Sequence, residues 1–210
     1  MCIRDRYTAM VFAGVMEFED GLMVVQQRGA AMQEASDRTP SGMVTILGLE
    51  RVQVEALCAK ARQDDILEIA NLLAPDTIVV SGTNAACERV AEMALAMGAM
   101  KVVPLAVAGA FHTQIMHPAD HRLQEVLTQV TLRRPRIPVI SNVDARPHEN
   151  PEEIRQLLIR QVVHPVLWEE SMRYLISQGF TEFYEVGPGR VLRGLLKRID
   201  RSVSCHNVSG

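Results

Sequence analysis

The sequence has few aromatic residues, no long apolar run and no marked excess of either charge. Only 4% of its 210 residues are aromatic, although 48% are hydrophobic. No window offers the ~20 unbroken apolar residues that a membrane-spanning helix requires. The net charge of −3 provides no bulk attraction for nucleic acid or anionic lipid. The composition therefore predicts a soluble globular protein, and it excludes a disordered tail and a fibrous protein.

Paired cysteines are also missing from the sequence. Its four cysteines are scattered and form no Cys-x-x-Cys motif: Cys2, Cys58, Cys87 and Cys205. The first residues show none of the basic, apolar and small-residue segments of a secretory signal. We therefore expect reduced thiols and a cytoplasmic protein.

A long amphipathic helix is predicted over residues 16–36. Its apolar or small side chains recur at intervals of three or four residues and would share one stripe: Phe18, Leu22, Val25, Gly29 and Met32. Acidic residues near its start suit the positive end of the helix dipole. Proline and glycine in residues 39–42 predict a turn after it.

Short strands and helices alternate between residues 41 and 107. The pattern predicts strands at 43–47, 66–70, 77–81 and 101–107, with helices over 51–62 and 85–97. This βαββαβ order is typical of the ferredoxin-like split βαβ, in which helices cover one face of an antiparallel sheet. We expect residues 41–107 to form a small subdomain.

Strands and helices also alternate in the second half of the chain. The pattern there predicts strands at 138–141 and 181–186 and helices over 118–130, 151–162, 165–178 and 191–199. The helices over 151–162 and 165–178 would each carry proline in the first turn, where no amide donor is needed. Strands that alternate with helices indicate a parallel sheet. The predicted fold class is α/β, with residues 7–40 and 108–208 forming a large subdomain around the small one.

Several motifs occur in a fixed order along the chain: Arg28-Gly29-x-x-Met32-Gln33-Glu34-Ala35, Ala110-Phe111-His112, Ser141-Asn142-Val143-Asp144, Arg160-Gln161 and Glu185-Val186-Gly187-Pro188-Gly189. Together they resemble the malonyl-CoA:acyl carrier protein transacylases of fatty-acid synthesis, from about Tyr7 to Val208. The resemblance implies a hydrolase-like parallel sheet in the large subdomain and a ferredoxin-like small subdomain. It also implies transfer of malonyl from coenzyme A to the phosphopantetheine thiol of acyl carrier protein.

The resemblance further implies a ping-pong Ser–His mechanism, with the nucleophile on a Gly-His-Ser-x-Gly-Glu-Tyr turn. Tyr7 matches the last residue of that motif, which puts the serine at Ile3. Residues 1–6 therefore look like a foreign segment joined to an N-terminally truncated chain, and the first strands of the large-subdomain sheet should be missing. We expect the chain as written to be inactive.

The resemblance assigns His112 as general base and acid, with its ring oriented by the backbone carbonyl of Gln161. By themselves, these residues also fit a solvent-exposed loop histidine and an ordinary helical glutamine. No metal or bound cofactor is required by this chemistry; malonyl-CoA is the substrate, and phosphopantetheine is carried by the partner.

Three residues are expected to bind substrate. Arg28 borders the apolar stripe, and its guanidinium can grip both oxygens of the malonyl carboxylate. Phe111 resembles the form associated with malonyl in related acyltransferases, because its ring leaves less room for an α-methyl group. Asn142 matches a family position near the site. Each residue also has a purely structural interpretation: Arg28 could cover the flank of its helix, Phe111 could pack in the core, and Asn142 could be an ordinary turn residue.

Other polar groups invite further interpretations. His112, His117 and His121 suggest a metal site, but no carboxylate stands out as a third ligand, so no metal is expected. A glycine turn before a helix, such as Gly187-Pro188-Gly189, can bind a phosphate group, but a single turn of this kind is weak evidence for such a site. We interpret it as a tight strand-to-helix turn lining the cleft.

A basic stripe is predicted along the last helix, where an acidic carrier protein could dock: Arg190, Arg193, Lys197 and Arg201. The alternative is a solvated helix face. The basic run at residues 133–136 is a second candidate surface.

Two other functions remain open at this point. The chain could belong to a polyketide-type assembly line that uses another acyl group, or it could be a non-enzymatic binding module built on the ferredoxin-like part. Residues 71–77 depart from the family's Asn-x-Asn-x-Pro-x-Gln segment, which changes the expected polarity of the cleft.

Overall fold

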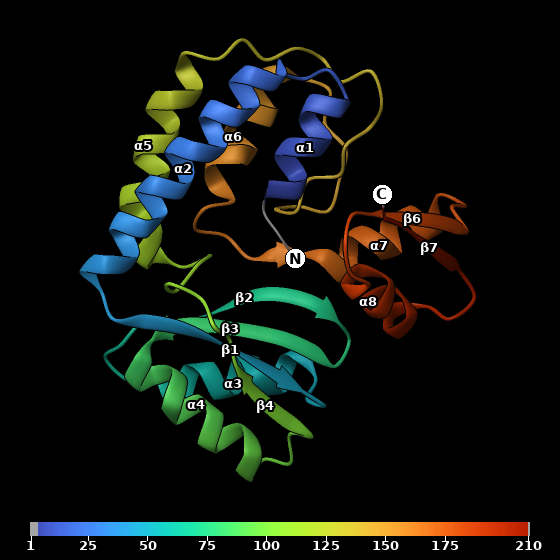
Figure 1. Cartoon of the computed structure of the whole chain (residues 1–210). Coiled ribbons are helices and arrows are strands. Elements are labelled where there is room, and N and C mark those ends of the chain that lie inside the picture. Colours follow the sequence, from blue (N-terminus) through green and yellow to red (C-terminus); the bar gives the residue numbers. More distant parts are fainter. Residues whose placement is uncertain (1–3, 210) are drawn as a thin grey trace.

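The structure, a computed structural model, describes residues 4–209 and arranges them in three parts (Figure 1). The helical part consists of α1 (Arg4–Phe12), α2 (Phe18–Arg38), α5 (His117–Thr128) and α6 (Pro151–Arg160), with the short 3-10 helix η1 (Gln114–Met116) before α5. The sheet part consists of β1 (Ser41–Leu47), β2 (Leu67–Ala74), β3 (Thr77–Thr83), β4 (Lys101–Pro104), α3 (Arg51–Arg62) and α4 (Asn84–Ala96). The third part consists of α7 (Trp168–Ser177), β6 (Glu182–Val186), α8 (Val191–Ile199) and β7 (Ser204–Val208).

The sheet confirms the βαββαβ order predicted from the sequence. Its strands lie in the order β4-β1-β3-β2, each antiparallel to its neighbour, and β5 (Val166–Leu167) adds a short parallel pairing at the β2 edge. Both α3 and α4 lie on one side of this sheet (Figure 1). Apolar residues of β1, β3 and these helices form a buried cluster between them, including Ile46, Leu57, Ile78 and Val90. Complete burial of such a side chain stabilises the fold by about 1.5–3 kcal/mol.

Helix α2 buries only part of the face predicted from the sequence. Phe18 and Leu22 belong to the predicted stripe but are 64% and 60% exposed. The inward face instead carries mostly small residues together with one cation: Gly21, Val24, Arg28, Ala31, Met32, Ala35 and Ser36. Small side chains let α1 and α5 approach α2 closely, and a β-carbon at Gly21 would lie only 2.7 Å from Val11 Cγ2. The prediction is wrong for Phe18 and Leu22 and confirmed for Met32, because α2 has apolar residues on two faces.

The parallel sheet expected in the second half is reduced, within residues 4–209, to two short pairings. β6 pairs with β7, a strand that the pattern missed, and β5 pairs with β2. Residues 138–141 form a single bridge, Ile140 to Pro147, instead of a strand. Nearby prolines remove the amide donors that a ladder needs. Helix α7 starts at Trp168, so Pro165 lies before β5 and outside the helix.

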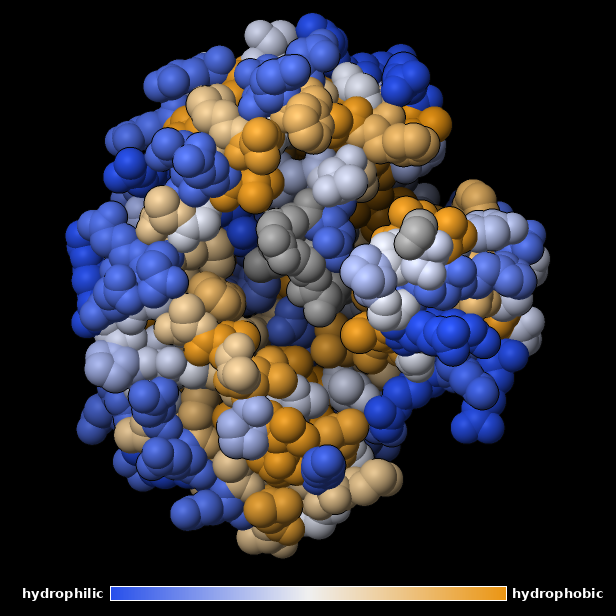
Figure 2. All heavy atoms as spheres, viewed as in Figure 1, coloured by the Kyte–Doolittle hydropathy of each residue, from blue (hydrophilic) through white to orange (hydrophobic). Residues whose placement is uncertain are grey.

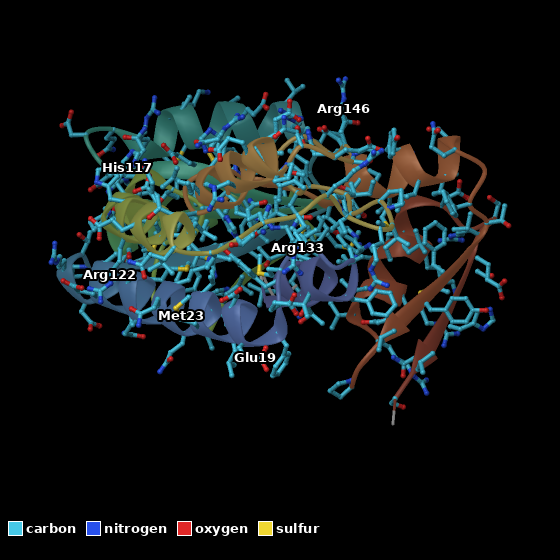
Figure 3. All side chains as sticks on the ribbon, turned by 90° about the horizontal axis from the view of Figure 1, so that it is seen from above. Glu19, Met23, His117, Arg122, Arg133 and Arg146 are labelled. Carbon is cyan, nitrogen blue, oxygen red and sulfur yellow. The ribbon has the colours of Figure 1, made fainter. Side chains whose placement is uncertain are left out.

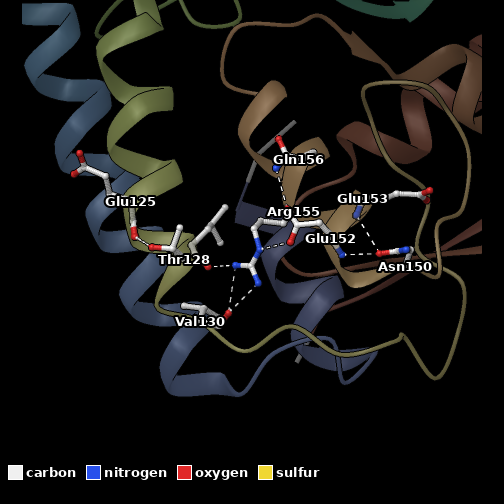
Figure 4. Close-up of polar contacts among 9 residues, drawn as sticks. Glu125, Thr128, Val130, Asn150, Glu152, Glu153, Arg155 and Gln156 are labelled. Carbon is white, nitrogen blue, oxygen red and sulfur yellow. Dashed lines mark hydrogen bonds and ion pairs between the residues drawn. The ribbon is translucent and has the colours of Figure 1, made fainter.

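An arginine in the middle of α6 connects this helix to the end of α5 (Figure 4). Arg155 of α6 donates to the carbonyl of Leu127 and, at 3.3 Å, to that of Val130. These carbonyls lie at and after the end of α5, where intrahelical donors run out and a positive charge suits the dipole. Asn150 Oδ1 accepts from the amides of Glu152 and Glu153 and so caps the start of α6.

On the face drawn in Figure 2, the surface is hollowed between the helical part and the sheet. None of the helices in residues 4–209 has both the length and the apolar character that crossing a bilayer would demand.

A test of the sheet is the substitution Gly82→Ala. A β-carbon there would lie 2.1 Å from the carbonyl oxygen of Ile66, which is backbone and cannot swing aside. We expect a loss on the order of 2 kcal/mol or more in the free energy of unfolding, measured by denaturant titration. Gly29→Ala in α2 is the control, because a β-carbon there would meet no atom within 4 Å and alanine favours a helix by about 1 kcal/mol. Equal effects of the two substitutions would contradict this packing.

Candidate functional site

A cavity of about 510 Å³ separates α2 from the sheet. Its walls come from three stretches of the chain: α2, the strands β1 to β3, and the segment after β4. Among the lining residues are Arg28, Met32, Asn71, Phe111 and His112. The sequence-predicted residues Arg28, Phe111 and His112 therefore face one hollow although 84 positions separate the first from the last.

His112 is the most constrained residue of this cavity. It lies in the loop between β4 and η1, is 3% exposed, and has a positive φ of 65°. Its Nδ1 lies 2.9 Å from the backbone carbonyl oxygen of Gln161, just after α6. A carbonyl only accepts, so Nδ1 carries the ring proton and Nε2 is left as the basic nitrogen. Strained backbone of this kind is held by surrounding contacts and is common at functional sites.

Burial keeps the imidazole neutral. It lowers the pKa of His112 to about 4, and the positive charges of Arg28 and Arg6 act in the same direction. The backbone of Gln161 and His164 opposes them by hydrogen bonding. A neutral imidazole with a free Nε2 can accept a proton from a hydroxyl or thiol placed next to it.

Arg28 brings a positive charge to the cavity from the inner face of α2. It is 7% exposed, and its charge acts on both His112 and Tyr7. A guanidinium on the wall of a cavity can form two parallel hydrogen bonds to a carboxylate. The cavity thus combines a neutral base with a group suited to a carboxylated substrate.

The side chain of Gln161 also contributes to the site, which sequence reasoning missed. Its Oε1 accepts from Arg6 at 3.1 Å, and its Nε2 donates to the carbonyls of His164 and Pro165 at 3.0 and 3.4 Å. These bonds fix the segment whose backbone carbonyl meets His112. The role assigned to the backbone alone is therefore incomplete.

Arg6 is a second neighbour that sequence reasoning missed, because residues 1–6 were set apart from the fold. It belongs to α1 and is buried, and this burial lowers the pKa of its guanidinium to about 10. No sequence signal could have found it, since Gln161 lies 155 residues away. The predicted serine position, Ile3, lies outside the described residues.

Asn142 does not join the other predicted residues. It lines a separate hollow of about 290 Å³ together with Arg6 and Trp168. Its backbone carbonyl accepts from the amide of Leu167 at 2.9 Å. Asn142 thus lines a different hollow from the one that holds His112, and it sits at a turn that anchors β5, so its expected contact with substrate stays a prediction.

The turn at Gly187-Pro188-Gly189 is a tight link between β6 and α8, as predicted, but it is not among the residues that line the cavity. Glu185 caps α8: its carboxylate oxygens accept from the amides of Leu192 and Arg193, both at 2.9 Å. These are the amides that a phosphate would use. A carboxylate already in place argues against a phosphate site.

The four basic residues predicted to form a stripe lie along one hollow, but only Arg193 and Lys197 belong to α8, because Arg190 precedes the helix and Arg201 follows it. Arg190, Arg193, Lys197 and Arg201 line a hollow of about 560 Å³ beside β7. Elsewhere, His117 and His121 meet Asp120, and their ligand atoms lie within 4.8 Å of one another. No carboxylate stood out from the sequence as a third ligand, but helical spacing puts Asp120 beside both histidines.

The comparisons with known proteins show which family the chain belongs to. The sequence profile of the acyl transferase domain matches residues 6–207. The chain belongs to the acyl transferase domain family. This acyl transferase domain is 38% identical over 193 residues to the malonyl CoA-acyl carrier protein transacylase of Escherichia coli strain K12, covering 92% of this chain and 62% of that protein.

Two solved structures show the same fold. The malonyl CoA-acyl carrier protein transacylase of Coxiella burnetii superposes with a TM-score of 0.94 at 37% identity, covering 96% of this chain and 64% of that one. A malonyl-transacylase in complex with its type II PKS acyl-carrier protein superposes with a TM-score of 0.91 at 35% identity, and the match covers 98% of this chain and 66% of that one. This acyl transferase domain thus spans less than two thirds of the length of the Escherichia coli and Coxiella burnetii relatives.

The buried imidazole predicts a pH dependence of stability. The folded-state pKa of His112, about 4, lies below the ordinary value of 6.5, so the unfolded chain binds this proton more readily. Stability from this residue is complete above about pH 6.5 and falls by up to about 3 kcal/mol as the pH drops through about 4. Denaturant titrations at several pH values should show a shallower loss for His112→Gln than for the unmodified chain. The exposed His206→Gln is the control, and a slope equal in all three proteins would contradict the burial of a neutral imidazole.

Proposed function

We propose that this acyl transferase domain takes part in moving malonyl from malonyl-CoA to the phosphopantetheine thiol of acyl carrier protein. One observation carries the proposal: a buried neutral histidine and a buried arginine line the same cavity. The names of its relatives, malonyl CoA-acyl carrier protein transacylases, support the same substrates. We place this activity in the cytoplasm, since the buried thiols Cys58 and Cys87 are free.

The proposed chemistry is a ping-pong transfer through a serine. His112 Nε2 takes the hydroxyl proton as the serine oxygen attacks the thioester carbon, and the carbon–sulfur bond then breaks. The imidazolium returns its proton to the departing coenzyme A thiolate. The carrier thiol reverses these steps, with His112 first accepting the thiol proton and then returning a proton to the serine. The printed sequence has Ile3 where the resemblance puts this serine.

Arg28 links substrate choice to the base. Its positive charge is one of the causes that lower the pKa of His112. A malonyl carboxylate paired with Arg28 offsets that charge, so the imidazole becomes more basic when the correct substrate is bound. An acetyl group has no such carboxylate. Phe111, on the cavity wall, would limit the room beside the α-carbon.

The basic residues in and beside α8 form the proposed docking surface for the acidic carrier protein. Arg190, Arg193, Lys197 and Arg201 line one hollow, so their charges act together on an approaching partner. Another malonyl-transacylase has been solved with its type II PKS acyl-carrier protein, which makes a polyketide-type carrier the second candidate partner. We propose no nucleic-acid or membrane partner and no bound cofactor or metal for the transfer itself.

Binding measurements with Arg28 variants test the role of the guanidinium without needing a nucleophile. We expect the chain to bind malonyl-CoA more tightly than acetyl-CoA by about 10- to 100-fold, the effect of one charge-assisted hydrogen-bonded pair. Arg28→Met should abolish this preference. Arg28→Lys should retain a part of it, because lysine keeps the positive charge but cannot form the two parallel hydrogen bonds of a guanidinium. Calorimetric titration measures the dissociation constants of malonyl-CoA and acetyl-CoA. The exposed Arg122→Met is the control, and an unchanged preference in Arg28→Met would disprove the assignment.

Transfer assays test the Ser–His mechanism. We expect no transfer of labelled malonyl to carrier protein by the 210-residue chain. Transfer should appear when residues 1–6 are replaced by the N-terminal part of a full-length family member that ends in the family's Gly-His-Ser-x-Gly-Glu turn. In that chimaera, His112→Gln should lower the rate by about 10²–10⁴-fold. Activity of the unmodified chain, or a fully active His112→Gln chimaera, would count against this mechanism.

A further inference from the structure

Three side chains with metal-binding atoms meet in the first turns of α5. They are His117, Asp120 and His121, and their ligand atoms lie within 4.8 Å of one another. We propose that these residues form a surface site for one divalent transition-metal ion of the Zn²⁺ type. The sequence pattern predicted no metal because no carboxylate ligand stood out, and Asp120 supplies that ligand.

Asp120 is already fixed between the two imidazoles. Its carboxylate is buried, with Oδ2 3.0 Å from His117 Nδ1 and Oδ1 3.9 Å from His121 Nε2. Oδ1 also accepts from the backbone amide of His121 at 2.7 Å. The carboxylate is therefore held in place before an ion arrives, which reduces the entropy lost on binding.

The spacing suits an ion held by nitrogen and oxygen. Zn²⁺ binds imidazole nitrogen and carboxylate oxygen at about 2.0–2.2 Å, so two ligands of a tetrahedral ion lie roughly 3.5 Å apart. The two nitrogen–oxygen distances present here, 3.0 and 3.9 Å, fall on either side of that value. Small rotations of the histidines would let the ion replace the direct contact between His117 and Asp120.

The surroundings leave room for such rotations. The His117 and His121 side chains are 54% and 79% exposed, and their ring centroids lie 6.3 Å apart. Both project from the same face of α5 because they are four residues apart. Water can fill the remaining coordination position. Figure 3 shows His117 and Arg122 at one end of the molecule, with β6 and β7 at the other.

Electrostatics decide which ion is favoured. The start of a helix carries partial positive charge and opposes a cation, and the Asp120 carboxylate offsets this. The nearest basic residue in sequence, Arg122, donates to Gln27 Oε1 of α2 at 3.3 Å. Two imidazoles with one carboxylate favour Zn²⁺, Ni²⁺ and Cu²⁺ over Mg²⁺ and Ca²⁺, which prefer oxygen ligands.

The site is separate from the cavity of the proposed transfer reaction. Among the described residues that line that cavity, none is His117, Asp120 or His121. The connection between them is short, because η1 leads from the His112 loop directly into α5. An ion that joins the side chains of the first turns would stabilise the start of α5, and its role is structural.

Calorimetric titration of the 210-residue chain with zinc chloride tests the site. We expect one ion bound per chain and about tenfold or greater loss of affinity in His117→Gln, His121→Gln and Asp120→Asn, since each removes one ligand. His206→Gln is the matched control, because His206 is also a surface histidine beside one carboxylate, that of Glu182 at 3.2 Å. Magnesium chloride should give no comparable binding.

Thermal unfolding provides a second readout. Zinc should raise the unfolding midpoint of the unmodified chain and of His206→Gln, but not that of His121→Gln. His121 is largely exposed, so its substitution keeps the test valid if Asp120→Asn fails to fold. Zinc binding that survives both His117→Gln and His121→Gln, equal binding of magnesium, or no binding at all would overturn the proposal.

Discussion

The hydrogen bond from His112 Nδ1 to the carbonyl of Gln161 is the interaction on which the candidate site depends. It joins the loop after β4 to the end of α6 across 49 residues of sequence. It fixes the tautomer, the ring orientation and the strained backbone of His112 at once. An aspartate in the place of this carbonyl would add a negative charge and raise the basicity of the ring. A neutral acceptor raises the pKa of the histidine only by hydrogen bonding, so burial, the largest cause, still keeps that pKa low, and Arg28 and Arg6 lower it further.

Much of the local fold could be predicted from the sequence because its signals are short-range. Helices α3 and α8 have the predicted bounds, and the βαββαβ order follows from alternating apolar patterns and turn residues. The failures involve packing between distant segments. The face of α2 depends on which neighbours approach it, and Phe18 and Leu22 are as apolar as the residues that are buried. β7 exists only because β6 lies beside it.

The candidate site divides in the same way. His112, Arg28 and Phe111 could be found because the motifs around them resemble a known family, whereas periodicity alone gives them no chemical role. Arg6 and Asn142 show what a motif cannot supply. A motif gives a position along the chain, and the direction of a side chain is set by contacts with other elements. Asp120, by contrast, could have been found from the sequence, because its spacing of three residues from His117 places both on the same helical face.

The side chain of Gln161 shows how strongly its surroundings restrict the residue type. Its oxygen must accept from Arg6, while its nitrogen must donate to the carbonyls of His164 and Pro165. A glutamate would satisfy Arg6 but offer no donor to the carbonyls, and a leucine would satisfy neither partner. Either change leaves buried polar groups without hydrogen bonds, at about 1–3 kcal/mol each. An amide is therefore the natural choice, and it holds the end of α6 rigid where its backbone meets the imidazole.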